Sequence, residues 1–206
     1  MDASARLTAA RLPVWTLVIC ANAALVFGSA AIQAFLIYDR NAIAHGELWR
    51  LVTGNLAHLS TTHLGYDLAA FLIVGTIIEV RGYRYFSTLC LSAATLIGVV
   101  LYFAEPAMHH YAGLSGVATA AVVYLCLHGL TEQGTWRWLC VAVLVGLSAK
   151  IGIELALDKS LLFEIGMQEF VPVPLSHLVG AATALLLFVL VRLSELACGA
   201  RGVSVP

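Results

Sequence analysis

Two polar residues stand where apolar segments of this chain begin, and their types could do nucleophilic chemistry. Ser115 lies in the sequence Gly113-Leu-Ser-Gly116 and opens one apolar run, and His177 opens another. If the two runs pack together as helices, the imidazole can take the serine proton, which is the minimal requirement for an activated hydroxyl. The sequence therefore predicts Ser115 as a nucleophile and His177 as its general base, although a Gly-Leu-Ser-Gly sequence alone more often serves helix packing.

A second polar group enters the second apolar run. His63 and Asp67 are four residues apart and share one face of a helix, whereas His58 points elsewhere if that helix already includes it. The first N–H groups of a helix have no partner within it, so they can hold a developing oxyanion. We therefore expect the backbone N–H groups of Leu114 and Ser115 to stabilise an oxyanion together with the side chain of His63.

Small residues predict where helices approach each other. Gly113 and Gly116 allow a sharp turn and a close neighbour beside the serine, and Gly180 follows His177 on one helical face. If the helices meet on these faces, Ser115 and His177 come within hydrogen-bonding reach.

The remaining charged residues of the apolar runs favour structural roles. Lys150 and Glu154 are expected to form a buried ion pair that fixes the fifth run. Arg50, next to Trp49 in a loop, can tie loop carbonyl groups together. The sequence has no metal-ligand spacing, so we expect no metal and no cofactor.

The elements that must position these residues follow from composition. The chain has 206 residues, of which 61% are hydrophobic and 11% charged, and its mean hydropathy of +0.92 excludes a soluble domain. Six apolar runs approach the length of a membrane span, at residues 14–37, 64–78, 85–103, 114–130, 138–157 and 175–193. We expect an all-α, polytopic membrane protein, a single six-helix domain over residues 1–206 with its core at about 48–193.

The basic residues beside the runs predict the orientation in the membrane. Seven of them fall on one side, namely Arg6, Arg11, Arg81, Arg84, Arg137, Arg192 and Arg201, and three on the other, namely Arg40, Arg50 and Lys159. Because Lys and Arg resist translocation, both termini are expected in the cytoplasm. The loops at residues 38–57 and 158–174, and the start of the run at 114, are then on the outer side.

Several motifs resemble those of the rhomboid intramembrane serine proteases, in the same order and with compatible spacing over about residues 48–193. They are Trp49-Arg50, His58-Leu-Ser-Thr-Thr-His63-Leu-Gly-Tyr-Asp67, Glu79 and Gly82, Gly113-Leu-Ser-Gly116, and His177-Leu-Val-Gly180. The resemblance implies a six-helix bundle and a Ser115–His177 dyad that cleaves membrane-anchored proteins in or near a transmembrane segment, with His63 and Asp67 assisting the oxyanion. It also implies an integral protein of the bacterial inner membrane, with an active site that opens to the periplasmic side.

This chain departs from the family pattern at three positions, with Asp67 for an asparagine, Thr119 for an aromatic residue and Ala184 for a glycine. The small size, the Lys150 and Glu154 pair and the residues before His177 further resemble the rhombosortase subgroup, which processes proteins with a C-terminal Gly-Gly-type membrane tail.

Asp67 has two possible states. A desolvated carboxyl group beside His63 could be neutral and donate a hydrogen bond to the oxyanion, as asparagine would. Alternatively, it could be ionised and orient His63 as a donor. The desolvation argument favours the neutral donor.

Two other functions are compatible with parts of this sequence. A catalytically inactive rhomboid-like protein that binds membrane clients would need neither Ser115 nor His177. A proton-relay transporter would be expected to show repeated halves and broken helices, and the sequence shows neither. The net charge of −1 gives no reason to expect a nucleic acid partner, so the expected partners are membrane-anchored substrates and the lipid bilayer, while the oligomeric state stays open.

Overall fold

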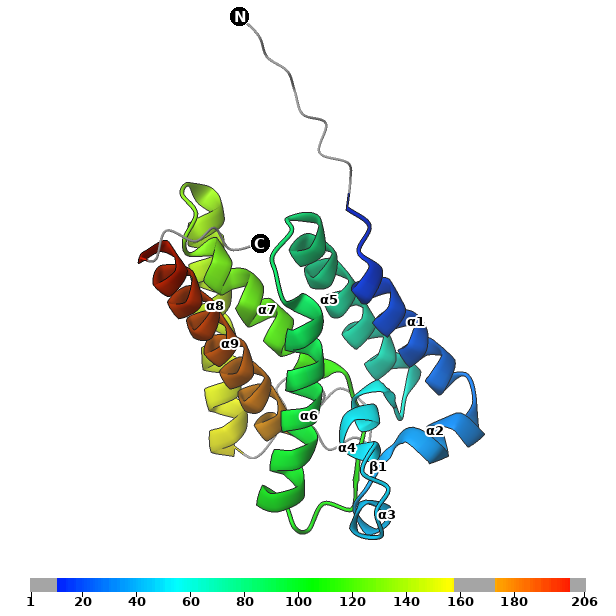
Figure 1. The fold of residues 1–206 in the computed structure, drawn as a ribbon. Coiled ribbons are helices and arrows are strands. Elements are labelled where there is room, and N and C mark those ends of the chain that lie inside the picture. The colour runs from blue at the N-terminus through cyan, green and yellow to red at the C-terminus, as the bar shows by residue number, and fades with distance from the viewer. Residues whose placement is uncertain (1–10, 158–172, 201–206) are drawn as a thin grey trace, which may run out of the picture.

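The structure is a computed structural model that describes residues 11–157 and 173–200 (Figure 1). Its helices are α1 Val14–Phe27, α2 Ala30–Leu36, α3 Arg40–Ala44, α4 Arg50–Thr53, the 3-10 helix η1 Gly54–Leu56, α5 Thr61–Val80, α6 Phe86–Ala104, α7 Ser115–Gly129, α8 Thr135–Leu157 and α9 Pro174–Ala200. Two short strands accompany them, β1 Tyr38–Asp39 and β2 His110–Tyr111. Both ends of the expected 1–206 domain, and nearly all of the expected outer loop at 158–174, lie outside the described residues.

Four helices, α5, α6, α8 and α9, are each long and apolar enough to cross a membrane. α1 and α2 meet the same criterion only as a bent pair, and α7 is apolar but has 15 residues. Among the described residues there are therefore four candidate spans, or five with the bent pair counted as one. The expectation of a helical membrane bundle is confirmed at this level.

The expected single helix over residues 14–37 is wrong in its second half. α1 ends at Phe27 with Gly28 as its C-cap, and α2 leaves the break at an angle of 113° to α1. Ser29 caps the new helix by accepting a hydrogen bond from the N–H of Ile32 at 3.5 Å. Hydropathy reports the apolarity of a run but not its direction, so the sequence pattern did not predict this turn.

One carboxylate on α5 fixes the start of α1. Oε2 of Glu79 accepts hydrogen bonds from Oγ1 and N of Thr16, at 2.6 and 2.8 Å, and Oε1 accepts one from N of Trp15 at 3.0 Å. The first N–H groups of a helix lack helical partners and carry partial positive charge, so an acidic group there is stabilising. This contact sets α1 against α5.

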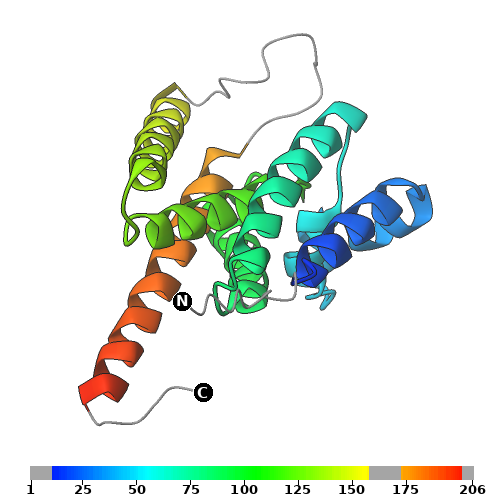
Figure 2. The same ribbon diagram turned by 90° about the horizontal axis from the view of Figure 1, so that it is seen from above.

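α7 is the central helix of the bundle, packed against α5, α6, α8 and α9. Most of its side chains are buried, whereas the buried side chains of α8 are Cys140, Ile151 and Glu154. Figure 2 shows α1 and α8 at opposite edges of the bundle. Because protein encloses α7, polar groups at its start can be satisfied inside the membrane by neighbouring side chains.

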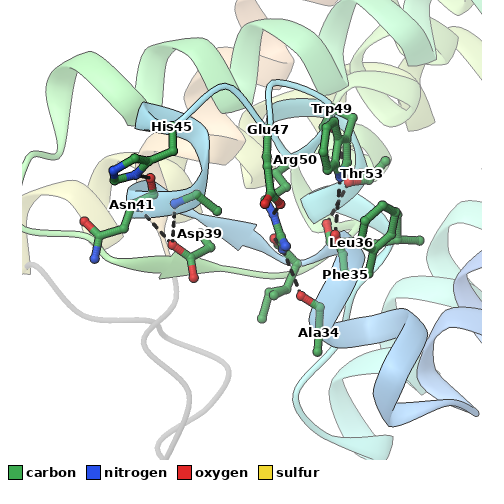
Figure 3. Close-up of polar contacts among 12 residues, drawn as sticks. Ala34, Phe35, Leu36, Asp39, Asn41, His45, Glu47, Trp49, Arg50 and Thr53 are labelled. Carbon is green, nitrogen blue, oxygen red and sulfur yellow. Dashed lines mark hydrogen bonds and ion pairs between the residues drawn. The ribbon is translucent and has the colours of Figure 1, made fainter.

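The segment between α2 and α5 is folded around the buried side chain of Arg50 (Figure 3). Nη1 of Arg50 donates to the carbonyl oxygens of Ala34 and Ile37 at 2.9 and 2.8 Å, and Nε donates to Glu47 at 2.6 Å. The guanidinium does tie backbone carbonyl groups together, but they lie at the C-terminal end of α2 and not within the loop as expected.

The two strands hold the chain that leads into α7. β1 and β2 are antiparallel, with Tyr38 opposite Tyr111 and Asp39 opposite His110. Just after β2, the N–H of Gly113 donates to the carbonyl oxygen of Gly54 at 3.4 Å. Backbone contacts therefore fix this segment before it reaches Ser115.

Candidate active site

Ser115 and His177 come together at the starts of two packed helices. Ser115 is the first residue of α7, and His177 lies in the first turn of α9. Oγ of Ser115 is 3.1 Å from Nε2 of His177, within hydrogen-bonding distance. Only 9% of His177 is exposed and Ser115 is half-buried, so the imidazole is shielded from bulk solvent.

Two glycines permit the close approach of α7 and α9. A Cβ atom at Gly180 would lie 2.1 Å from the carbonyl oxygen of Gly116. A Cβ atom at Gly116 would lie 3.0 Å from the carbonyl oxygen of Ser176 and 2.7 Å from Cδ1 of Ile97. The two backbones are thus in direct contact one helical turn from His177.

Gly113 meets two requirements at once. Its φ of +141° is a conformation that side-chain-bearing residues rarely adopt. A Cβ atom there would also lie 2.7 Å from Cε1 of His63. The absence of a side chain therefore lets the His63 ring pack against the chain two residues before Ser115.

The carboxylate of Asp67 gathers three nitrogen groups at one oxygen. Oδ2 accepts a hydrogen bond from N of Leu114 at 2.8 Å and lies 3.1 Å from Nε2 of His58 and 3.2 Å from Nε2 of His63. The three side chains are buried. Asp67 thereby links α5 to the residue directly before Ser115.

His58 belongs to this group because α5 does not include it, so the condition under which it would point elsewhere is not met. α5 begins only at Thr61, because Ser60 caps it by accepting a hydrogen bond from N of His63 at 3.2 Å. His58 therefore precedes the helix, and the loop turns its ring toward Asp67. The capping serine was the available signal, since Ser and Thr favour the N-cap position.

The hydrogen bonds bear on the protonation of Asp67. Nδ1 of His58 lies 3.2 Å from the carbonyl oxygen of Leu56, which can only accept, so Nδ1 carries a proton. The peptide N–H of Leu114 is a fixed donor to Oδ2. In a neutral ring Nε2 of His58 is then an acceptor, so its 3.1 Å contact with Oδ2 needs a proton. A charged His58 beside an ionised Asp67 supplies that proton, and so does a neutral Asp67 that donates to His58. In either case Oδ2 engages the Leu114 N–H, which is not open toward Ser115 in this state.

The three buried groups raise the question of a metal. The ligand atoms of His58, His63 and Asp67 lie within 4.8 Å of one another. The N–H of Leu114, however, is 2.8 Å from Oδ2 and 3.4 Å from Nε2 of His58, so its partial positive charge faces the position a cation would take. The donor set therefore fits a hydrogen-bond network better than it fits a cation.

The expected ion pair on α8 is confirmed. Nζ of Lys150 lies 2.7 Å from Oε2 of Glu154. The Glu154 side chain is fully buried, whereas that of Lys150 is 25% exposed. The same oxygen of Glu154 is 3.4 Å from Nδ1 of His177, a contact that the sequence analysis missed.

Replacing Asp67 tests its protonation. If Asp67 is ionised and Ser115 and His177 form the protease dyad that the sequence predicts, Asp67→Asn should lower the cleavage rate roughly 10-fold, about 1.4 kcal/mol, at every pH where the wild type works. The reason is that the amide keeps an acceptor for Leu114 but loses the charge that holds His58 and His63. Rates of cleavage of a membrane substrate across pH measure this effect.

The matched control is Asp39→Asn. Asp39 caps α3, and the hydrogen bond from the N–H of Ala42 lowers the pKa of its carboxyl group. Asparagine caps helices about as well as aspartate, so this variant should keep its rate. If the Asp67→Asn enzyme instead stays fully active, and its rate no longer falls at high pH as the wild-type rate does, Asp67 is a neutral donor.

Comparison with known proteins bears on this geometry. Residues 45–194, which include both Ser115 and His177, match the family described as Rhomboid domain. The Rhomboid protease GlpG of Haemophilus influenzae (strain ATCC 51907 / DSM 11121 / KW20 / Rd) is 32% identical over 119 residues. The match covers 53% of this chain and 60% of that protein, so this chain spans less than two thirds of the relative's length.

Proposed function

This chain belongs to the rhomboid family, and from that membership we propose that it is an intramembrane serine endopeptidase. The observation that carries the proposal is the 3.1 Å separation of Ser115 Oγ and His177 Nε2 in a shielded position at the start of the central helix. An inactive client-binding protein would have no need of this pair.

In the proposed reaction, Oγ of Ser115 attacks the carbonyl carbon of the substrate peptide bond while Nε2 of His177 takes its proton. The tetrahedral intermediate collapses as the imidazolium gives that proton to the leaving nitrogen. The remaining acyl-enzyme is released by water or by an amine, with His177 acting again as base.

The negative oxygen of the intermediate needs donors. We assign this role to the N–H of Ser115, which has no partner within α7, and to the side chain of His63. The N–H of Leu114 can join them only if it exchanges its bond to Asp67 for one to the substrate.

The proposed substrates are membrane-anchored proteins, cut in or near a transmembrane segment. Helix-breaking residues near the cut are expected, because a peptide bond inside an intact helix has its carbonyl group engaged. The residues that resemble rhombosortases support a narrower proposal, the processing of a C-terminal Gly-Gly-type membrane tail.

We further propose a six-span topology in the bacterial inner membrane, with α7 as a short span and both termini in the cytoplasm. The starts of α1 and α8 and the ends of α5, α7 and α9 lie at one end of the bundle (Figure 1). Most of the basic residues flank these helix ends, as the positive-inside rule requires of a cytoplasmic face. The site at the start of α7 then opens outward.

A serine-reactive fluorophosphonate probe tests function and orientation together. A membrane-impermeant probe applied to intact spheroplasts should label the protein, because an activated serine that opens outward is accessible. In the same cells, a reporter with a Gly-Gly-type membrane tail should be cleaved faster than one whose tail lacks the glycines.

Failure of the probe to label even detergent-solubilised protein would favour the inactive client-binding function. Labelling only after permeabilisation would reverse the orientation, and equal cleavage of both reporters would remove the Gly-Gly preference.

A further inference from the structure

We propose that Glu154 is a third member of the active site, a positioning residue that holds the imidazole of His177. This inference rests on the proposed protease function and extends it from a dyad to a Ser115–His177–Glu154 arrangement. Its basis is a continuous chain of polar contacts from α7 through α9 to α8.

The contacts run in sequence across three helices. Oγ of Ser115 is 3.1 Å from Nε2 of His177, and the other ring nitrogen, Nδ1, is 3.4 Å from Oε2 of Glu154. That separation is an ion-pair distance, and Nδ1 makes no hydrogen bond to a described residue in this state. Catalytic hydrogen bonds are often long or poorly aligned without substrate and tighten when it binds. Lys150 reaches the same oxygen at 2.7 Å.

The complete burial of the Glu154 side chain needs a physical explanation, and a role in holding His177 supplies one. α8 has few buried side chains, and a carboxylate in the membrane is costly unless its charge is used or paired. Lys150 is 25% exposed, and its flexible stem could carry an ion pair to the edge of the membrane. Glu154 instead points inward, fully buried, and reaches His177. A pair that only stabilised α8 would not require that direction.

The chemistry of the reaction gives Glu154 a role. When Nδ1 of His177 donates its proton toward Glu154, the lone pair of Nε2 is left facing Ser115, as a general base requires. The serine proton then moves to Nε2 while Nδ1 keeps its own, so the imidazolium forms beside an ionised carboxylate. Glu154 gains and loses no proton in this cycle.

Two variants separate positioning from simple stabilisation. Glu154→Gln keeps size but removes the charge, and Lys150→Met with Glu154→Gln also removes the ammonium group that would otherwise be left without its carboxylate. We expect both enzymes to cleave a membrane substrate about 10²-fold more slowly with unchanged KM, since losing the orienting carboxylate of a triad costs up to roughly 10⁴-fold. Glu195→Gln, on the exposed part of α9, removes an equal charge and should leave the rate within about twofold.

A second measurement reads the imidazole directly. In ¹⁵N-histidine-labelled protein, with the signal of His177 identified among the seven histidines by its loss in His177→Gln, the wild type should show the Nδ1–H tautomer. The double variant should lose that preference. This readout does not depend on turnover and would not change if Glu154 only stabilised α8.

The outcomes are distinct. A double variant that recovers the wild-type rate, or a wild-type His177 with its proton on Nε2, would overturn the positioning role and leave Glu154 as half of a structural pair. Those results would leave the protease function standing as long as the fluorophosphonate labels the wild type. A slow double variant that melts at the wild-type temperature and has an altered tautomer would support the proposal.

Discussion

Ser115→Ala and His177→Ala should each abolish cleavage while the protein still inserts and accumulates. Losing the nucleophile or base of a serine protease lowers turnover on the order of 10⁶-fold, because binding cannot replace either role. The two effects should not add, since both residues act on the same proton. Cleavage of a membrane substrate and fluorophosphonate labelling measure the loss, and immunoblots of membrane fractions measure accumulation.

Matched controls distinguish catalysis from folding. Ser92→Ala removes a hydroxyl that bonds within α6, and His109→Ala removes an exposed ring, so both enzymes should remain active. Substantial turnover by Ser115→Ala, or a double variant far slower than either single one, would show that the reacting pair is assigned wrongly.

Gly180→Val should destroy activity and destabilise the protein by about 3 kcal/mol or more. Its first side-chain atom would fall 2.1 Å from the carbonyl oxygen of Gly116, and a backbone atom cannot move aside as a flexible side chain can. α9 must therefore shift away from α7 and take His177 away from Ser115. Thermal unfolding in detergent and the labelling rate measure the two effects.

Gly146→Val on α8 is the control, because a Cβ atom there meets nothing within 4 Å. This variant should remain folded and reactive. A fully active Gly180→Val enzyme would mean that α7 and α9 do not touch at this point.

The sequence predicted most helices because each long apolar run matches one membrane-spanning length, as with α5 and α6. It also indicated that Ser115 and His177 could approach each other, since small residues follow each of them on a helical face. Other features depend on contacts between distant segments. The pairing of Tyr38 with Tyr111 joins loops far apart in sequence, and no pattern in either strand specifies it.

The same limit applies to Glu154. Its spacing from Lys150 predicted the pair within α8, but the contact with His177 depends on how α8 and α9 are rotated against each other. The direction of His58 likewise follows from where α5 begins, and the histidine spacing alone does not define that point.

The short length of α7 has a consequence for where a substrate is cut. The C-terminal end of α7 lies near the partly exposed Arg81–Glu132 ion pair, which places that end next to water. The hydrogen bond from Tyr83 lowers the pKa of Glu132 there. Fifteen helical residues reach about 22 Å, whereas the hydrocarbon layer is about 30 Å thick. In the proposed topology, Ser115 then lies about 8 Å below the opposite surface of the hydrocarbon layer. The cut should fall about two residues inside that surface if the substrate is extended and about five if it is helical, an offset that mass spectrometry of the released fragment would measure.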